Sequence, residues 1–157
     1  MDKFKIADKK EHMKSKHLSQ NNNWCIIYSD IEFTQKAQKE IITKIFDTYR
    51  KKRRNSPYEW NRNVFPYENP DYSESKKINF PDGFMYFRLQ ISIEEIDSYD
   101  IGDCIEFASS VLTSLWSLQI PSVATCQFED LLPLKGGYKS KWSCSPPKVD
   151  LESEVEK

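Results

Sequence analysis

Few residues of this 157-residue chain have a type and spacing that could carry chemistry. The clearest are two carboxylate pairs, Glu94 with Glu95 and Glu129 with Asp130, each of which follows a segment with strand-like character. If the two strands were parallel neighbours, four carboxylates would converge at one sheet edge and could bind Mg²⁺ or act as general acid and base. Charged loop residues are the commoner explanation, because exposed acids usually do no more than bind water. A carboxylate metal-dependent enzyme is therefore the weakest of three hypotheses.

The cysteines and histidines do not form a recognisable site. The four cysteines are Cys25, Cys104, Cys126 and Cys144. They include no Cys-x-x-Cys pair, and three lie in apolar segments, which favours free thiols over a disulfide. His12 and His17 lie five residues apart in a polar stretch, so they would not share one face of a helix as zinc ligands. The chain also lacks a Gly-rich phosphate loop and a Gly-x-Ser-x-Gly motif.

Charge is distributed unevenly along the chain, although the formal net charge is only −1. Residues 89–134 contain eight acids and no Lys or Arg, whereas residues 33–62 contain nine basic residues and three acids. Such asymmetry speeds association with a partner of opposite charge. The alternative is that the acids stabilise a helix by lying near the positive end of its dipole, and that the basic run at 50–54 is a solvated helix end. That run, with Tyr58 and Trp60 nearby, could also receive nucleic-acid phosphates and bases.

Hydrophobic periodicity predicts a small α+β domain that positions these charges. Helical spacing of apolar residues predicts two amphipathic helices, near 32–54 and 98–118. Apolar runs and alternation predict strands at 24–28, 84–93 and 122–128, with a further candidate at 58–65. Such elements make a two-layer sandwich, with a mixed or antiparallel sheet and both helices on one face. If 58–65 pairs, the order becomes the β-α-β-β-α-β pattern of the ferredoxin-like fold.

The predicted strand at 84–93 has two different faces. Met85, Phe87 and Leu89 point toward a core, while Tyr86 and Arg88 point the other way, where solvent is expected to reach. Tyr86 and Arg88 are therefore candidate anchors for a partner.

The length suits one domain, which we place at 24–142. A mobile polar arm is expected at 1–23 and a flexible acidic tail at 143–157. No apolar run approaches the ~18 residues that a membrane-spanning helix needs, and residues 1–23 lack the apolar stretch of a signal peptide. We expect a cytoplasmic protein with no role in a membrane.

Two segments of the chain resemble a known class of proteins. One reads Gly-Phe-Met-Tyr-Phe-Arg over 83–88, and the other reads Ile-Pro-Ser-Val-Ala-Thr-Cys-Gln-Phe-Glu-Asp-Leu-Leu-Pro over 120–133 and closes with Gly136-Gly137-Tyr138. With the helix that ends in Leu115-Trp116, they resemble small bacterial immunity proteins of polymorphic-toxin systems, including contact-dependent growth inhibition. The resemblance covers residues 83–138. It implies a non-enzymatic cytoplasmic protein that binds and blocks one cognate toxin domain, and it transfers no site residues because each immunity protein matches its own toxin.

The charge pattern and the resemblance lead to one hypothesis: a toxin inhibitor that occludes the active site of its toxin, often a nuclease. Nuclease clefts are positively charged because they hold phosphates, so an acidic face could cover one. The expected contacts are Glu94, Glu95, Asp97, Asp100, Asp103, Glu129 and Asp130, with Tyr86 and Arg88 as anchors. We expect no catalytic residue, no metal, no cofactor and no membrane partner. The alternative is a nucleic-acid-binding accessory protein that uses the basic run 50–54.

Overall fold

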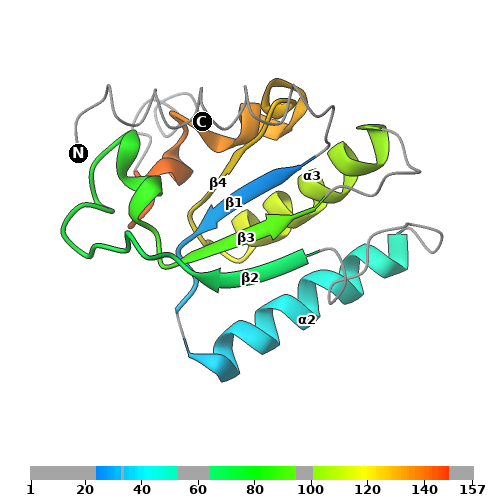
Figure 1. The fold of residues 1–157 in the computed structure, drawn as a ribbon, viewed down its shortest axis with the longest axis horizontal. Helices are drawn as coiled ribbons and strands as arrows, with labels where there is room; N and C mark the ends of the chain where they lie inside the picture. Colours follow the sequence, from blue (N-terminus) through cyan, green and yellow to red (C-terminus); the bar gives the residue numbers. More distant parts are fainter. Residues whose placement is uncertain (1–23, 33, 53–63, 95–100, 149–157) are drawn as a thin grey trace, which may run out of the picture.

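The computed structural model describes residues 24–32, 34–52, 64–94 and 101–148 (Figure 1). The strands are β1 (Cys25–Ser29), β2 (Val64–Glu68), β3 (Leu89–Ile93) and β4 (Ser122–Thr125). The α-helices in these ranges are α2 (Gln35–Lys52) and α3 (Ile101–Ser117). Short 3-10 segments are η1 (Asp82–Tyr86), η2 (Glu129–Leu131), η3 (Pro133–Gly137) and η4 (Lys141–Ser143).

The strands form one antiparallel sheet in the order β2-β3-β1-β4. In the chain, α2 lies between β1 and β2, and α3 lies between β3 and β4, so each helix separates two strands that have a third strand between them in the sheet. This is the double split β-α-β arrangement of the ferredoxin-like pattern. The predicted α+β sandwich is confirmed, and its sheet is antiparallel.

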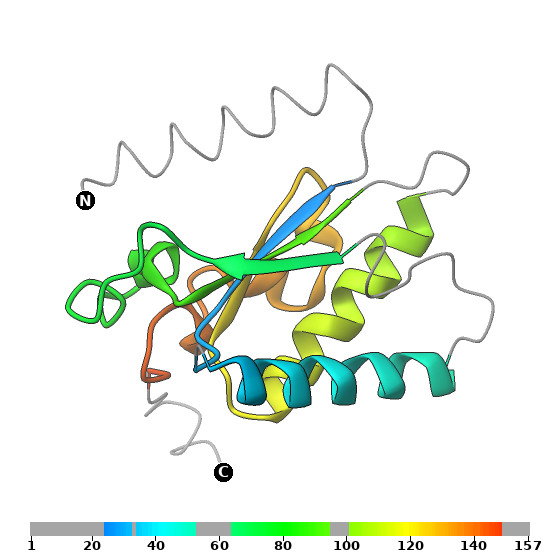
Figure 2. The same ribbon diagram turned by 60° about the horizontal axis from the view of Figure 1, so that its bottom comes forward.

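Both helices cover the same face of the sheet (Figures 1 and 2). α2 packs against α3, and α3 packs against β1 and β4. The Tyr49 ring of α2 meets the Phe107 ring of α3 edge to face, with centroids 4.8 Å apart. The core between helices and sheet is built mainly from Cys25, Ile27, Ile42, Ile45, Leu89, Ile91, Ile93, Val111, Leu112 and Leu115. Burial of this apolar surface is the main force that joins the two layers.

The other face of the sheet is partly covered by η1 and has a small apolar cluster of its own, which is a correction to the sequence prediction. The strand that we expected over 84–93 begins only at Leu89, because the preceding residues fold into η1. Gly83 permits this turn: a Cβ there would lie 2.4 Å from the Lys77 carbonyl oxygen. Phe84 of η1 then stacks edge to face on Tyr28, with centroids 5.5 Å apart. The wet strand face that we expected is therefore largely buried.

Gln90 shows how a polar residue is accommodated on that second face. It is 7% exposed, and its side-chain amide donates to Asn69 Oδ1 at 3.0 Å. Its carbonyl oxygen Oε1 accepts from the Tyr67 hydroxyl at 2.5 Å. Asn69 in turn donates to the main-chain oxygens of Met85 and Phe87. Each polar group thus has a partner, as buried groups require.

The remaining boundaries differ from the prediction in ways that have local causes. β2 overlaps the predicted 58–65 only at its first residues, and 58–63 lie outside the described part of the chain. Pro66 lies in the middle of β2, which is tolerated because β2 is an edge strand. β4 ends before residue 128 because the Cys126 N–H turns to the Glu129 carboxylate, 3.3 Å away.

The packed structure also continues beyond residue 142, where we expected a flexible tail to start. Ser143, Cys144 and Ser145 are buried. The Ser145 N–H donates to the Lys77 carbonyl oxygen at 2.9 Å, which ties this segment to the loop before η1. The predicted arm at 1–23 and the end of the predicted tail, 149–157, lie outside the described residues.

A buried ion pair connects three separate segments of the chain. Lys77 Nζ lies 3.0 Å from Asp30 Oδ2, and both side chains are less than a tenth exposed. The Ser145 hydroxyl donates to the same carboxylate oxygen. The end of β1, the loop before η1 and the C-terminal segment therefore meet at one carboxylate.

We expect Lys77→Met to lower the free energy of unfolding by about 3 kcal/mol, because it leaves the Asp30 carboxylate buried without its cation. Urea denaturation of the purified protein measures the loss. Adding Asp30→Asn to Lys77→Met should recover part of it. Lys76→Met is the matched control, since the exposed Lys76 only lies over the Tyr86 ring, a contact worth about 0.5–1 kcal/mol. Equal losses for Lys77→Met and Lys76→Met would contradict the role of the ion pair.

Candidate functional site

The strand directions bring acidic residues to one edge of the sheet. β3 and β4 both run antiparallel to β1, so they are parallel to each other and their C-terminal ends lie at the same edge. Glu94 follows β3 directly, Asp130 follows β4 by a few residues, and α3 begins with Asp103 in its first turn. We call the site formed by Glu94, Asp103 and Asp130 the acidic edge. The two strands are not neighbours as the sequence hypothesis required, because β1 lies between them.

The predicted contact residues differ in how they meet solvent. Glu94 and Asp130 are exposed, and Asp103 is half-buried. Glu129 is only 8% exposed and holds the backbone of Cys126, so it fixes the loop after β4. The remaining predicted contacts, Glu95, Asp97 and Asp100, lie outside the described residues. Among the described residues no group of three His, Cys, Asp or Glu side chains is placed to hold a metal ion.

Tyr86 and Arg88 lie away from the acidic edge, at the other end of β3. Tyr86 is 5% exposed within the second apolar cluster, so it is not the solvent-facing anchor that the alternation predicted. Arg88 donates from Nη2 to Glu74 Oε1 at 2.7 Å, and its Nε lies 3.6 Å from Asp30 Oδ1. These contacts give Arg88 a structural role in holding the loop before η1.

Glu74 is the exposed member of this charge cluster. Its carboxylate accepts hydrogen bonds from the Tyr72 hydroxyl and from Arg88, and these two bonds lower its pKa to about 2. Lys77 contributes a further contact at 3.3 Å. The Arg88 guanidinium also lies over the Tyr72 ring, 5.5 Å from its centroid. The carboxylates of Asp30 and Glu74 face the cations of Lys77 and Arg88, so the cluster is balanced in charge.

The cysteines are free and buried, as the sequence predicts. Cys25 faces Cys126 across the end of the β1–β4 ladder, since the preceding pair is Ile26 with Thr125. A hydrogen bond with Cys126 and burial raise the pKa of the Cys25 thiol. A buried thiol with a raised pKa is a poor nucleophile. Cys25, Cys104 and Cys126 therefore act as small apolar residues of the core.

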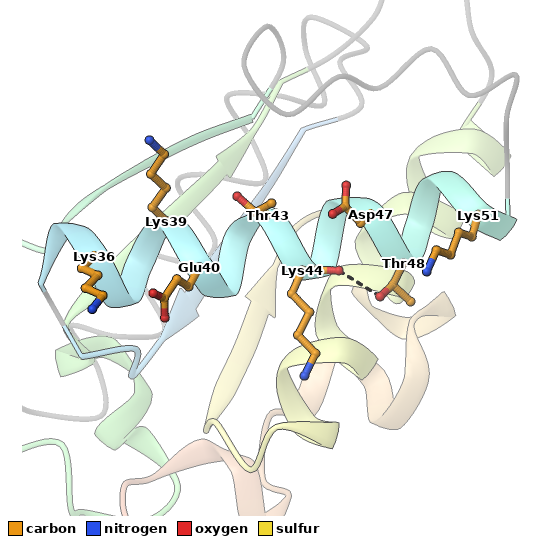
Figure 3. A pocket seen from close by; sticks show the side chains of 8 residues that line it. All are labelled: Lys36, Lys39, Glu40, Thr43, Lys44, Asp47, Thr48 and Lys51. Atoms are coloured by element: carbon orange, nitrogen blue, oxygen red, sulfur yellow. Dashed lines mark hydrogen bonds between the residues drawn. The ribbon is translucent and has the colours of Figure 1, made fainter.

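A basic hollow runs along the outer side of α2 (Figure 3). Its lining residues are Lys36, Lys39, Glu40, Thr43, Lys44, Asp47, Thr48 and Lys51. All eight side chains come from a single helix. The Thr48 hydroxyl donates a hydrogen bond to the Lys44 carbonyl oxygen at 2.9 Å. Of the predicted basic run 50–54, the structure describes the backbone up to Lys52, where α2 ends. Arg53 and Arg54 are outside the described residues.

Comparison of the chain with protein-family models, with curated proteins and with solved structures gives no significant match in any of the three. Within the described residues, each helix is too short or too polar to cross a membrane. The site has therefore to be judged on its own geometry.

Sequence reasoning missed two exposed leucines beside Asp130. Leu131 and Leu134 are exposed, whereas Leu132 between them is buried. The available signal was the run Leu131-Leu132-Pro133-Leu134, which places three leucines in a short segment between a strand and two glycines.

Acid stability tests the Glu74 cluster. The pKa of Glu74 is lowered in the folded protein, so its contribution is present above pH 4.5 and is lost as the pH falls toward 2. Wild-type protein should lose thermal stability over this interval, and Glu74→Gln should remove part of that slope. The slope is obtained from melting temperatures measured by circular dichroism at several pH values. Glu68→Gln is the control for the loss of one exposed carboxylate. Identical slopes for wild type and Glu74→Gln would refute the assignment.

Proposed function

We propose that this protein is an immunity protein, a cytoplasmic inhibitor that binds one bacterial toxin domain and covers its active site. The observation that carries the proposal is the acidic edge, where Glu94, Asp103 and Asp130 come from three different elements to one side of the sheet. Carboxylates from three segments on one side of the sheet give that side a negative charge, which favours association with a partner whose surface is basic.

The mechanism is occlusion. A nuclease cleft carries cations that hold the phosphate backbone of its substrate, and the acidic edge presents carboxylates to the same cations. Asp103 and Asp130 lie on elements that pack into the core, so their positions are set before binding and less ordering is needed on association. Glu95, Asp97 and Asp100, which follow Glu94 in the sequence, remain candidate contacts of the same proposal.

Binding of nucleic acid is the second candidate, and the lysines of α2 favour it. Lys36, Lys39, Lys44 and Lys51 share the outer side of that helix. The same hollow includes Glu40 and Asp47, which reduce its attraction for phosphate. Affinity for a mixed-sequence oligonucleotide that falls steeply with salt would support this candidate, and its absence would remove it.

Charge reversal at the acidic edge tests the immunity function. The double variant Glu94→Lys with Asp130→Lys changes two exposed carboxylates, so the fold should be retained. Its association with the toxin domain should slow at least tenfold at low salt, because electrostatic steering is reversed. The proposal predicts that an adjoining gene encodes a large secreted protein, and the probe is the catalytically inactive C-terminal domain of that protein. Surface plasmon resonance gives the rates.

The matched control is Glu68→Lys with Glu40→Lys, which adds the same charge at exposed positions on β2 and α2. This control should slow association much less. Unchanged association for the Glu94/Asp130 variant would mean that the acidic edge is not the contact surface. A wild-type protein that does not bind the domain would refute the immunity function itself.

A further inference from the structure

The loop after β4 exposes two leucines at fixed positions. Leu131 is 66% exposed and Leu134 is 58% exposed. Two neighbouring apolar residues are buried instead: Phe128 and Leu132 belong to the core between sheet and helices. The loop therefore has enough buried apolar residues to fold, and neither of the two exposed leucines is needed for the core.

Backbone contacts hold this loop close to β4. A Cβ at Gly136 would lie 2.9 Å from the Ala124 carbonyl oxygen, and one at Gly137 would lie 2.9 Å from that of Ser122. Only glycine allows so close an approach. Within the loop, the Leu131 N–H donates to the Phe128 carbonyl oxygen at 2.9 Å. The exposed leucines are thus carried by a segment that is fixed at both ends.

The backbone at the second leucine is in an unfavourable conformation for its residue type. Leu134 has φ +50° and ψ +31°, and Lys135 has φ +52° and ψ +43°. This left-handed region suits glycine or asparagine, whereas a branched side chain with a Cβ is disfavoured there. The Lys135 N–H closes the turn by donating to the Leu132 carbonyl oxygen at 3.0 Å. A leucine is kept at a position where glycine would fit the backbone better and where the core does not use its side chain.

We propose that Leu131 and Leu134 form a leucine knob that inserts into an apolar pocket of the toxin domain, next to the contacts made by Asp130. A non-glycine residue stays in the left-handed region only where the surrounding structure holds it there, and such residues gather at ligand clamps and other functional sites. Asp130 directly precedes Leu131, so the pocket of the partner should have basic groups on its rim. This inference rests on the proposed immunity function and names the part of the surface that should govern the lifetime of the complex.

The test compares dissociation from the same inactive toxin domain. Leu131→Ala with Leu134→Ala should raise the dissociation rate, and with it Kd, at least tenfold, because apolar anchors act mainly after encounter. Their melting temperature should stay near that of wild type, since both side chains are exposed. Ile78→Ala is the matched control: Ile78 is also an exposed aliphatic residue, and it lies in the loop before η1 at the other end of β3. It should leave Kd unchanged.

A second variant separates recognition from folding. Leu134→Gly removes the side chain and relieves the left-handed backbone, so its melting temperature should equal or exceed that of wild type while Kd rises. A Kd within twofold of wild type for both leucine variants, with binding by wild type intact, would overturn the knob and leave the immunity function standing. A wild-type protein that does not bind the toxin domain would overturn both.

Discussion

Strand β1 is the constraint on which the rest of the molecule depends. It is central in the sheet and pairs antiparallel with β3 on one side and β4 on the other. Both partners must therefore run in the same direction, and the segments that follow them must emerge at the same edge. The acidic edge and the leucine knob are consequences of this pairing, because Glu94 follows β3 and the loop 129–135 follows β4. A slip of β1 by one residue would turn Ile27 out of the core and misplace both.

The charged residues at the two ends of the sheet have different roles: those at one end stabilise the fold, and those at the other end are exposed to solvent. At the end where β1 finishes and β3 starts, charged residues are paired internally: Asp30 with Lys77, and Arg88 with Glu74. These contacts hold the loop before η1 and the C-terminal segment in place. At the opposite end, Glu94 and Asp130 extend into solvent. Charges that stabilise the fold and charges available to a partner are thus separated by the length of the strands.

Much of this fold could be predicted from the sequence. The helical spacing around Ile42, Ile45 and Tyr49 and the apolar run at 24–28 are strong local signals, and they correspond to α2 and to the central strand. The predicted start of β3 was wrong. The alternation of apolar and polar residues over 84–93 is also compatible with a 3-10 turn, in which Phe84 packs in a second apolar cluster. Only the tertiary approach of residue 83 to the Lys77 carbonyl decides between them.

The candidate site was harder to predict from the sequence, because its geometry also depends on tertiary contacts. Residue types identify Glu94 and Asp130 as carboxylates near strand ends, but not that Glu129 turns inward to the Cys126 N–H. Tyr86 and Arg88 were assigned to a solvent-facing strand, although one is buried and the other is held by Glu74. The leucine knob depends on backbone angles at Leu134 and on glycine contacts with β4, which no local pattern specifies.

Hydrogen–deuterium exchange of the protein alone and in complex with the inactive toxin domain tests the central claim most directly. If β1 sets the binding surface by bringing the ends of β3 and β4 together, exchange should slow on binding in residues 129–135 and in the first turn of α3. The loop before η1 and the outer side of α2 should exchange as they do in the free protein. Protection confined to α2 or to the loop before η1, with none in 129–135, would contradict it.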